Sequence, residues 1–201
     1  MPSFKTVEKF EYTIADYFGS KYSVATDSCT HAIELSLRHD NIKSTTSPKR
    51  TYLSVPMTLS KLNISWSFTD NLWESYYYLG NTRIVDAAVL WKKDSYIPGT
   101  LMCLSFQFKK HLSIGRAGMI LLDDCSTYKK LKQMSYDGRD NDTPWTEQDI
   151  NEIGYHYYMT PEYAEYGIKK FKEVKDLEPK AWSYRDYPDL SQLKVFKSEC
   201  I

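Results

Sequence analysis

The start of the chain has a helical pattern of hydrophobic positions. Apolar side chains recur there at steps of three and four residues: Phe4, Val7, Phe10, Ile14 and Tyr17. Gly19 follows this run, so the pattern predicts an amphipathic helix with a glycine stop. Residues 22–25 then form a short β-prone run, and Ser28 or Thr30 can cap the next helix. A strand, a hydroxyl-rich turn and a helix start together leave free amide groups where an anion can bind.

The rest of the chain alternates short apolar runs with helical patterns. The runs that we expect to form strands are 52–55, 64–68, 83–85, 101–104 and 119–122. Further helices are expected at 126–136 and 161–175, and polar loops at 41–49 and 137–149. This alternation predicts an α/β fold, a three-layer α/β/α sandwich with a mostly parallel sheet. A ligand should then bind beyond the carboxyl ends of the strands, where Asp86 and Ser105 fall.

Composition removes several classes of partner. The chain has 201 residues with 42% hydrophobic content, which suits one core. Lysine plus arginine equals aspartate plus glutamate at 26 each, so no net field attracts nucleic acid or an anionic membrane. No apolar stretch approaches the ~20 residues of a membrane helix, and the charged first twenty residues do not suit a signal peptide. We therefore expect a cytoplasmic protein.

The cysteines and histidines do not predict a metal site. The four cysteines, Cys29, Cys103, Cys125 and Cys200, have no close ligand spacing, and the histidines do not cluster near them in sequence. Reduced thiols are the expectation.

A lysine and an aspartate stand out as candidate chemistry. Lys110 lies in the segment SFQFKKHLSIG at 105–115, between two apolar runs, and Asp86 lies upstream in IVDAA. This pair suits pyridoxal phosphate (PLP), because a lysine amine forms a Schiff base with its aldehyde and a carboxylate faces its pyridinium nitrogen. Taken alone, each residue has an ordinary alternative: a solvated lysine on a loop, and an aspartate that caps a turn.

These segments resemble the DegT/DnrJ/StrS family of PLP-dependent nucleotide-sugar aminotransferases. The family's lysine segment reads Ser-Phe-(His/Gln)-x-x-Lys-(Asn/His)-(Ile/Leu)-x-x-Gly, and its aspartate lies in Asp-x-Ala. Residues 7–37 resemble the opening helix, strand and phosphate loop, 55–58 resemble Val-Pro-x-x-Thr, and 154–159 resemble Gly-x-Asn-x-Arg-Met. The resemblance implies a reduced version of the large domain of fold-type I PLP aminotransferases at 1–178. Residues 179–201 would be an irregular tail in place of the small C-terminal domain.

The resemblance also assigns a site. Lys110 is expected to be catalytic, and the cofactor-binding positions are Lys110, Asp86, Ser105, Cys29, Thr30, Leu59, Val89 and His156. Asp86 would pair with the pyridine nitrogen, and Ser105 would contact the phosphate with the 29–30 loop.

Some of these positions depart from the family pattern. Cys29 replaces a glycine, Leu59 an aromatic ring that stacks on the cofactor, and Val89 a His or Gln. His156 and Tyr158 replace the Asn and Arg of a segment that normally reaches the neighbouring subunit, and a tyrosine cannot replace a cation. The chain between Asp70 and Arg83 is also too short for the usual strand-helix unit.

Two functions from different classes follow. The first is PLP-dependent transamination of a nucleotide-linked keto-sugar, with glutamate as the amino donor, for surface polysaccharide or O-antigen synthesis by a homodimer. The second is a catalytically inactive homologue that acts as a binding or assembly subunit. The substitutions favour the second, and the joint retention of Lys110, Asp86 and Ser105 favours the first.

Overall fold

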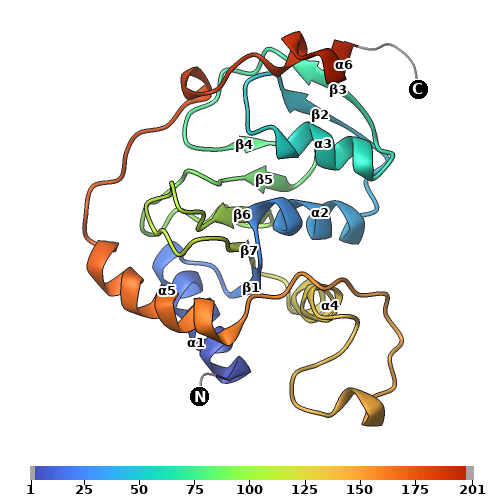
Figure 1. Cartoon of the computed structure of the whole chain (residues 1–201), viewed down its shortest axis with the longest axis vertical. Helices are drawn as coiled ribbons and strands as arrows, with labels where there is room; N and C mark the ends of the chain where they lie inside the picture. Colours follow the sequence, from blue (N-terminus) through green and yellow to red (C-terminus); the bar gives the residue numbers. More distant parts are fainter. Residues whose placement is uncertain (1–2, 198–201) are drawn as a thin grey trace.

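A five-stranded mixed sheet lies at the centre of the protein, in a computed structural model that describes residues 3–197. Its strands, in spatial order, are β1 (Tyr22–Thr26), β7 (Gly118–Leu122), β6 (Leu101–Ser105), β5 (Ile84–Asp86) and β4 (Tyr77–Tyr78) (Figure 1). A separate parallel pair, β2 (Ser44–Pro48) and β3 (Ser65–Thr69), lies beyond β4. The α/β architecture agrees with the sequence-based prediction.

The prediction of a mostly parallel sheet is wrong. Within the five-stranded sheet β5 and β6 pair in parallel, whereas β1–β7, β6–β7 and β4–β5 are antiparallel. The connections account for two of these antiparallel pairs, because neither the 106–117 loop from β6 to β7 nor the 79–83 turn from β4 to β5 contains a helix. Parallel neighbours need a crossover of a dozen or more residues, which usually contains a helix.

Helices cover both faces of this sheet, as expected. α1 (Phe4–Phe18) and α5 (Pro161–Val174) lie on one side, and α2 (Cys29–His39), α3 (Ser54–Lys61) and α4 (Cys125–Ser135) contribute to the other. The short helices are η1 (Trp145–Glu147), η2 (Tyr184–Asp186), η3 (Leu190–Gln192) and α6 (Lys194–Lys197). No helix among the described residues is both long and apolar enough to cross a membrane.

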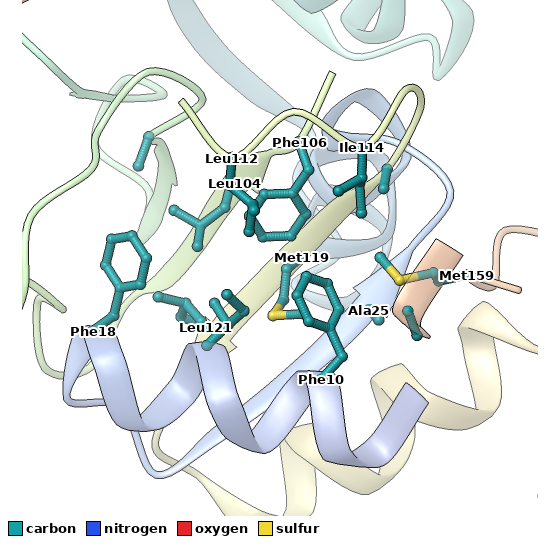
Figure 2. Close-up of a cluster of buried hydrophobic side chains, with 14 of the residues drawn as sticks. Phe10, Phe18, Ala25, Leu104, Phe106, Leu112, Ile114, Met119, Leu121 and Met159 are labelled. Atoms are coloured by element: carbon teal, nitrogen blue, oxygen red, sulfur yellow. The ribbon is translucent and has the colours of Figure 1, made fainter. Parts of the chain in front are cut away.

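Successive side chains of each strand point to opposite faces of the sheet, so the hydrophobic core consists of two clusters, one on each face. In β7, Met119 and Leu121 pack with Phe10 of α1 on one face (Figure 2). Ile120 and Leu122 pack with α2 on the other face. All four β7 side chains are at most 1% exposed, because successive residues of a strand point to opposite faces and both faces are covered. This explains why β7 reads as a continuous apolar run.

Two local predictions are wrong. Residues 41–49 were expected to form a loop because they are polar. β2 nevertheless forms within this Ser/Thr-rich segment, because its backbone pairs with that of β3. Residues 52–55 were expected to form a strand, yet α3 begins at Ser54. Pro56 stands in the first turn of α3, where a missing amide donor costs little.

The segment after α5 packs back along the β4 edge. The Tyr184 amide donates to the Trp73 carbonyl at 3.1 Å, and the Ser75 amide donates to the Trp182 carbonyl at 3.0 Å. The Leu190 amide donates to the Lys49 carbonyl at 2.8 Å. The tail that the sequence predicts at 179–201 is therefore ordered against the sheet as far as residue 197, and residues 198–201 lie outside the described part.

Candidate functional site

The turn from β1 into α2 forms one wall of the candidate site. Ser28 caps α2 by accepting a hydrogen bond from the His31 amide at 3.3 Å. Gly118 lies directly beneath this turn, where an added Cβ would come 2.3 Å from the Cys29 nitrogen and 2.6 Å from the Ser28 oxygen. Only glycine fits there, and its absent side chain lets the start of α2 lie against the end of β6, where Ser105 pairs with Gly118. The amide-rich start of α2 is thus placed next to Ser105.

Asp86 ends β5 and is 5% exposed. The Tyr77 hydroxyl donates to its Oδ2 at 2.6 Å, and the Ala88 amide donates to its Oδ1 at 3.0 Å. Burial raises the pKa of the Asp86 carboxyl, and these two hydrogen bonds together with the Lys110 charge oppose the rise. The site therefore holds a carboxyl group whose charged form depends on its neighbours.

Lys110 lies in a compact loop between β6 and β7. The Lys110 amide donates to the Gln107 carbonyl at 2.8 Å, and the Ile114 amide donates to the Phe106 carbonyl at 3.0 Å. Phe106, Leu112 and Ile114 are at most 2% exposed and anchor the loop in the core (Figure 2). Burial lowers the pKa of the Lys110 ammonium, and the interactions with Cys29 and Asp86 oppose that shift. A lowered pKa favours the neutral amine that a nucleophilic lysine requires.

A cavity of about 230 Å³ gathers five of the eight predicted positions. They are Cys29, Thr30, Asp86, Ser105 and Lys110, which come from three separate parts of the chain. Burial raises the pKa of the Cys29 thiol well above its usual value, with Asp86 and Cys103 adding to the rise. Cys29 is therefore a protonated, space-filling neighbour of Lys110 and Asp86.

The other three predicted positions do not line this cavity. Leu59 is fully buried in the α2–α3 side of the core. Val89 lines a neighbouring cavity. His156 is mostly exposed, and its Nδ1 lies 3.0 Å from the Asp137 carboxylate of the same chain.

Further residues that the sequence analysis did not assign to the site also line the cavity, and three of them carry polar groups of interest. Tyr52 and Ser54 come from the start of α3, and Arg116 comes from the end of the lysine loop. The Arg116 guanidinium lies 2.9 Å from Asp27 Oδ2 and is two-thirds exposed on the cavity rim. Arg116 directly follows the SFQFKKHLSIG segment, and no local pattern there indicates that its cation faces the site.

A second cavity of about 200 Å³ adjoins the first across Lys110, which lines both. The returning C-terminal segment forms its outer wall with Pro179, Lys180 and Trp182. The Lys110 amine lies 5.3 Å from the centre of the Trp182 ring. The C-terminal segment therefore lies close to the Lys110 side chain.

The described residues contain no group of three or more His, Cys, Asp or Glu side chains that could hold a metal ion. Cys29, Cys103 and Cys125 are free thiols, and Cys200 lies outside the described part of the chain.

The sequence profile of the DegT/DnrJ/EryC1/StrS aminotransferase family matches residues 2–78 and 97–181, well over half of the chain. The protein belongs to the DegT/DnrJ/EryC1/StrS aminotransferase family. The internal stretch that the profile does not match, 79–96, contains Asp86 and the β4–β5 turn, and residues 182–201 are also unmatched. No curated protein sequence matches the chain.

Several solved structures share the fold of this chain. AtS13 from Actinomadura melliaura superposes with a TM-score of 0.76 at 17% identity, over 87% of this chain and 61% of that one. The sugar aminotransferase CalS13 from Micromonospora echinospora gives 0.73 at 13% identity, over 86% and 61%. Spr1654 from Streptococcus pneumoniae, solved in a PLP form, gives 0.69 at 14% identity, over 84% and 59%. The chain thus spans about three fifths of the length of these relatives, and the family to which it belongs is PLP-dependent.

Proposed function

We propose that the chain binds PLP in the 230 Å³ cavity and acts as a sugar aminotransferase with Lys110 as the catalytic residue. The observation that carries the proposal is that one cavity gathers a lysine of lowered pKa, a buried carboxylate and a helix start. Each of these groups matches one end of the cofactor: aldehyde, pyridine nitrogen and phosphate.

The α2 side of the cavity suits the phosphate. Helix starts stabilise anions through free amides and the helix dipole. The Thr30 hydroxyl, which lies 2.8 Å from the Ser54 hydroxyl, and the Ser105 hydroxyl also line the cavity. Arg116 adds a cation at the rim, so the residues present fit a dianion.

Other residues that line the cavity suit the pyridine ring and the aldehyde of the cofactor. Bound PLP would supply an electron sink that stabilises negative charge at the substrate carbon. Asp86 would hold the proton on the pyridine nitrogen, and Val55 and Tyr52 would cover the ring from the α3 side. Lys110 would bind the aldehyde in the resting protein and carry a proton to and from the substrate carbon during transfer.

We further propose that the amino donor is glutamate and that the acceptor is a nucleotide-linked keto-sugar for surface polysaccharide or O-antigen synthesis, made by a cytoplasmic homodimer. Family membership supports this substrate class. The cavity beyond Lys110, with Lys109, Lys180 and Trp182 in its lining, offers cationic and aromatic contacts for an anionic substrate.

The deciding experiment is to incubate the purified protein with PLP, reduce it with borohydride and map the modified peptide by mass spectrometry. We expect a phosphopyridoxyl group on Lys110. Lys109→Ala provides the matched control, because Lys109 is the adjacent lysine of the same segment, and should leave the adduct in place. Lys110→Ala should remove it. An unmodified Lys110 in protein saturated with PLP would refute the proposal.

One observation favours the second candidate, a catalytically inactive binding or assembly subunit. His156 Nδ1 lies 3.0 Å from the Asp137 carboxylate of its own chain, so a contact between His156 and a neighbouring cofactor requires this interaction to break. The two functions differ in the first half-reaction. A PLP adduct on Lys110 without spectral conversion by glutamate, or by any of a panel of amino acids, would favour the inactive subunit.

A further inference from the structure

A chain of hydroxyl groups leads into the buried carboxylate of the site. The Thr51 hydroxyl lies 2.5 Å from the Tyr77 hydroxyl, which donates to Asp86 Oδ2 at 2.6 Å. Because the Tyr77 proton is directed at Asp86, Thr51 donates to the Tyr77 oxygen. The three side chains are at most 5% exposed, so water does not compete for these bonds.

The arrangement depends on the short strand β4. Tyr77 and Asp86 are opposite each other in the antiparallel β4–β5 pair, which fixes the phenol beside the carboxylate. β4 exists because the chain from 70 to 83 turns straight back towards β5. The Tyr77 phenol therefore reaches Asp86 from β4, a strand that the sequence pattern did not predict.

The flanking tyrosines make the contrast clear. Tyr76 and Tyr78 belong to the same Tyr-Tyr-Tyr run and are 38% and 39% exposed, whereas Tyr77 is 4% exposed. A strand alternates its side chains between faces, so the middle ring alone enters the site side of the sheet. Buried hydroxyls of tyrosine need a partner, and here the partner is the site carboxylate.

We infer that Tyr77 is a positioning residue that, backed by Thr51, holds Asp86 ionised and aimed at the pyridine nitrogen of the cofactor. This inference rests on the proposed PLP site. Oδ1 receives the Ala88 amide and Oδ2 receives the Tyr77 hydroxyl, so the carboxylate is fixed at both oxygens. Each carboxylate oxygen can accept a second bond, so one lone pair stays available for the pyridinium proton. Val89, close in sequence, is apolar and provides no such hydrogen bond.

Most side chains around Asp86 are neutral, so the hydrogen bond from Tyr77 contributes a large part of what stabilises the carboxylate. Cys29 from α2, Cys103 from β6 and Tyr187 from the C-terminal segment all have pKa values raised by burial and, further, by the Asp86 charge, so they remain neutral neighbours. Lys110 is the cation that interacts with Asp86. The Tyr77 and Ala88 donors belong to the folded chain itself, so they stabilise and position the carboxylate before a cofactor cation faces it.

The test compares Tyr77→Phe, which removes one oxygen atom, with the matched control Tyr78→Phe. In cofactor-free protein, the Asp86 carboxyl carbon is followed by NMR through a pH titration, with its signal assigned from Asp86→Asn. Loss of the Tyr77 donor should raise the pKa of Asp86, and Thr51→Val should raise it less. Tyr78→Phe should leave it unchanged.

The second readout is cofactor binding by full-length protein, measured by absorbance and by the pH at which the bound cofactor changes its spectrum. Because a hydrogen bond to a charged group is about twice as strong as a neutral one, Tyr77→Phe should weaken PLP binding about tenfold. Tyr78→Phe should bind as the wild type does.

Titration of Asp86 that is identical in Tyr77→Phe and Tyr78→Phe would overturn the inference. Wild-type protein that fails to bind PLP would instead refute the proposed function, while the NMR comparison would still judge whether Tyr77 controls Asp86. If Tyr77→Phe fails to fold, Thr51→Val takes its place, because it removes the second hydroxyl without touching the ring. An unshifted Asp86 titration in Thr51→Val would then count against the inference.

Discussion

The variant Asp86→Asn separates the functional role of the site carboxylate from its contribution to folding. An amide has nearly the same shape as a carboxylate but carries no charge. Asp86 receives donors at both oxygens, from Tyr77 at 2.6 Å and from Ala88 at 3.0 Å. Asparagine accepts at one atom only and presents an NH₂ group at the other, so one of these donors loses its acceptor.

The magnitude follows from the charge. A hydrogen bond to a charged group contributes about 1.5–3 kcal/mol, so loss of the bond to the pyridinium should weaken PLP binding by roughly 10- to 150-fold. The first half-reaction with glutamate should slow by ~100-fold or more, because a fixed charge aimed at the reacting system is lost. Both quantities can be measured by absorbance. The spectrum of bound PLP reports the affinity, and the change of that spectrum after glutamate is added reports the rate of the half-reaction.

The folding consequence has the opposite sign. Burial raises the pKa of Asp86, so the folded protein keeps a proton over a pH range in which the unfolded chain has already lost it. Through this group, the free energy of unfolding of cofactor-free protein falls as the pH rises from the ordinary pKa of an unfolded aspartate, ~3.9, towards the raised pKa of the folded protein. Asp86→Asn removes this pH dependence. The free energy of unfolding of the variant should therefore increase relative to that of the wild type as the pH rises. Asp70→Asn, at an exposed carboxylate, is the control and should change neither property.

Two results would refute the reasoning. Asp86→Asn protein that keeps a half-reaction rate within about threefold of wild type would show that Asp86 does not maintain the charged pyridinium. A stability difference between Asp86→Asn and wild type that does not change with pH would show that the Asp86 carboxyl does not titrate with a raised pKa in the folded protein.

Three further predictions concern the surroundings of the site. Lys132→Met should cost about 3 kcal/mol near neutral pH, because it leaves the buried Glu11 carboxylate, whose pKa burial already raises, without the cation 2.9 Å away. This loss of stability should become smaller as the pH falls and Glu11 takes up a proton, and urea unfolding at several pH values measures it. If the double variant Lys132→Met, Glu11→Gln lost as much stability as Lys132→Met alone, the prediction would be wrong. Gly118→Ala should lower stability by about 1–3 kcal/mol and weaken PLP binding, because the new methyl meets backbone atoms 2.3 Å and 2.6 Å away; unchanged melting and PLP affinity would contradict it. Light scattering of PLP-loaded protein should give a dimer of the 23.5 kDa chain, and a monomer at micromolar concentration would refute the proposed homodimer.

The tyrosines of the 154–159 segment, which the family resemblance directs towards a neighbouring subunit, do not form an exposed aromatic patch. Tyr155, Tyr157 and Tyr158 are half-buried. Tyr157 stacks on His31 with ring centres 3.6 Å apart, and Arg38 lies 4.5 Å from the centre of the Tyr155 ring. The case for a homodimer therefore rests on the family and not on a free aromatic surface.

The sequence by itself determined the elements whose signals are local. The period of apolar residues in α1, the glycine that ends it and the proline that begins α5 are all read within a few residues. The lysine segment and Asp86 could be singled out in the same way, because each combines a reactive side chain with a strand end. These features depend on near-neighbour geometry, which the order of residues encodes directly.

Only the tertiary structure decided which strands are neighbours and what surrounds the reactive groups. The direction of β4, the antiparallel pairs and the strand at β2 depend on contacts between residues far apart in sequence. The same contacts bring Tyr77 to Asp86 and Trp182 to Lys110. A local pattern specifies that a strand forms and which residues share a face, but its pairing partner is selected by the packing of the whole core.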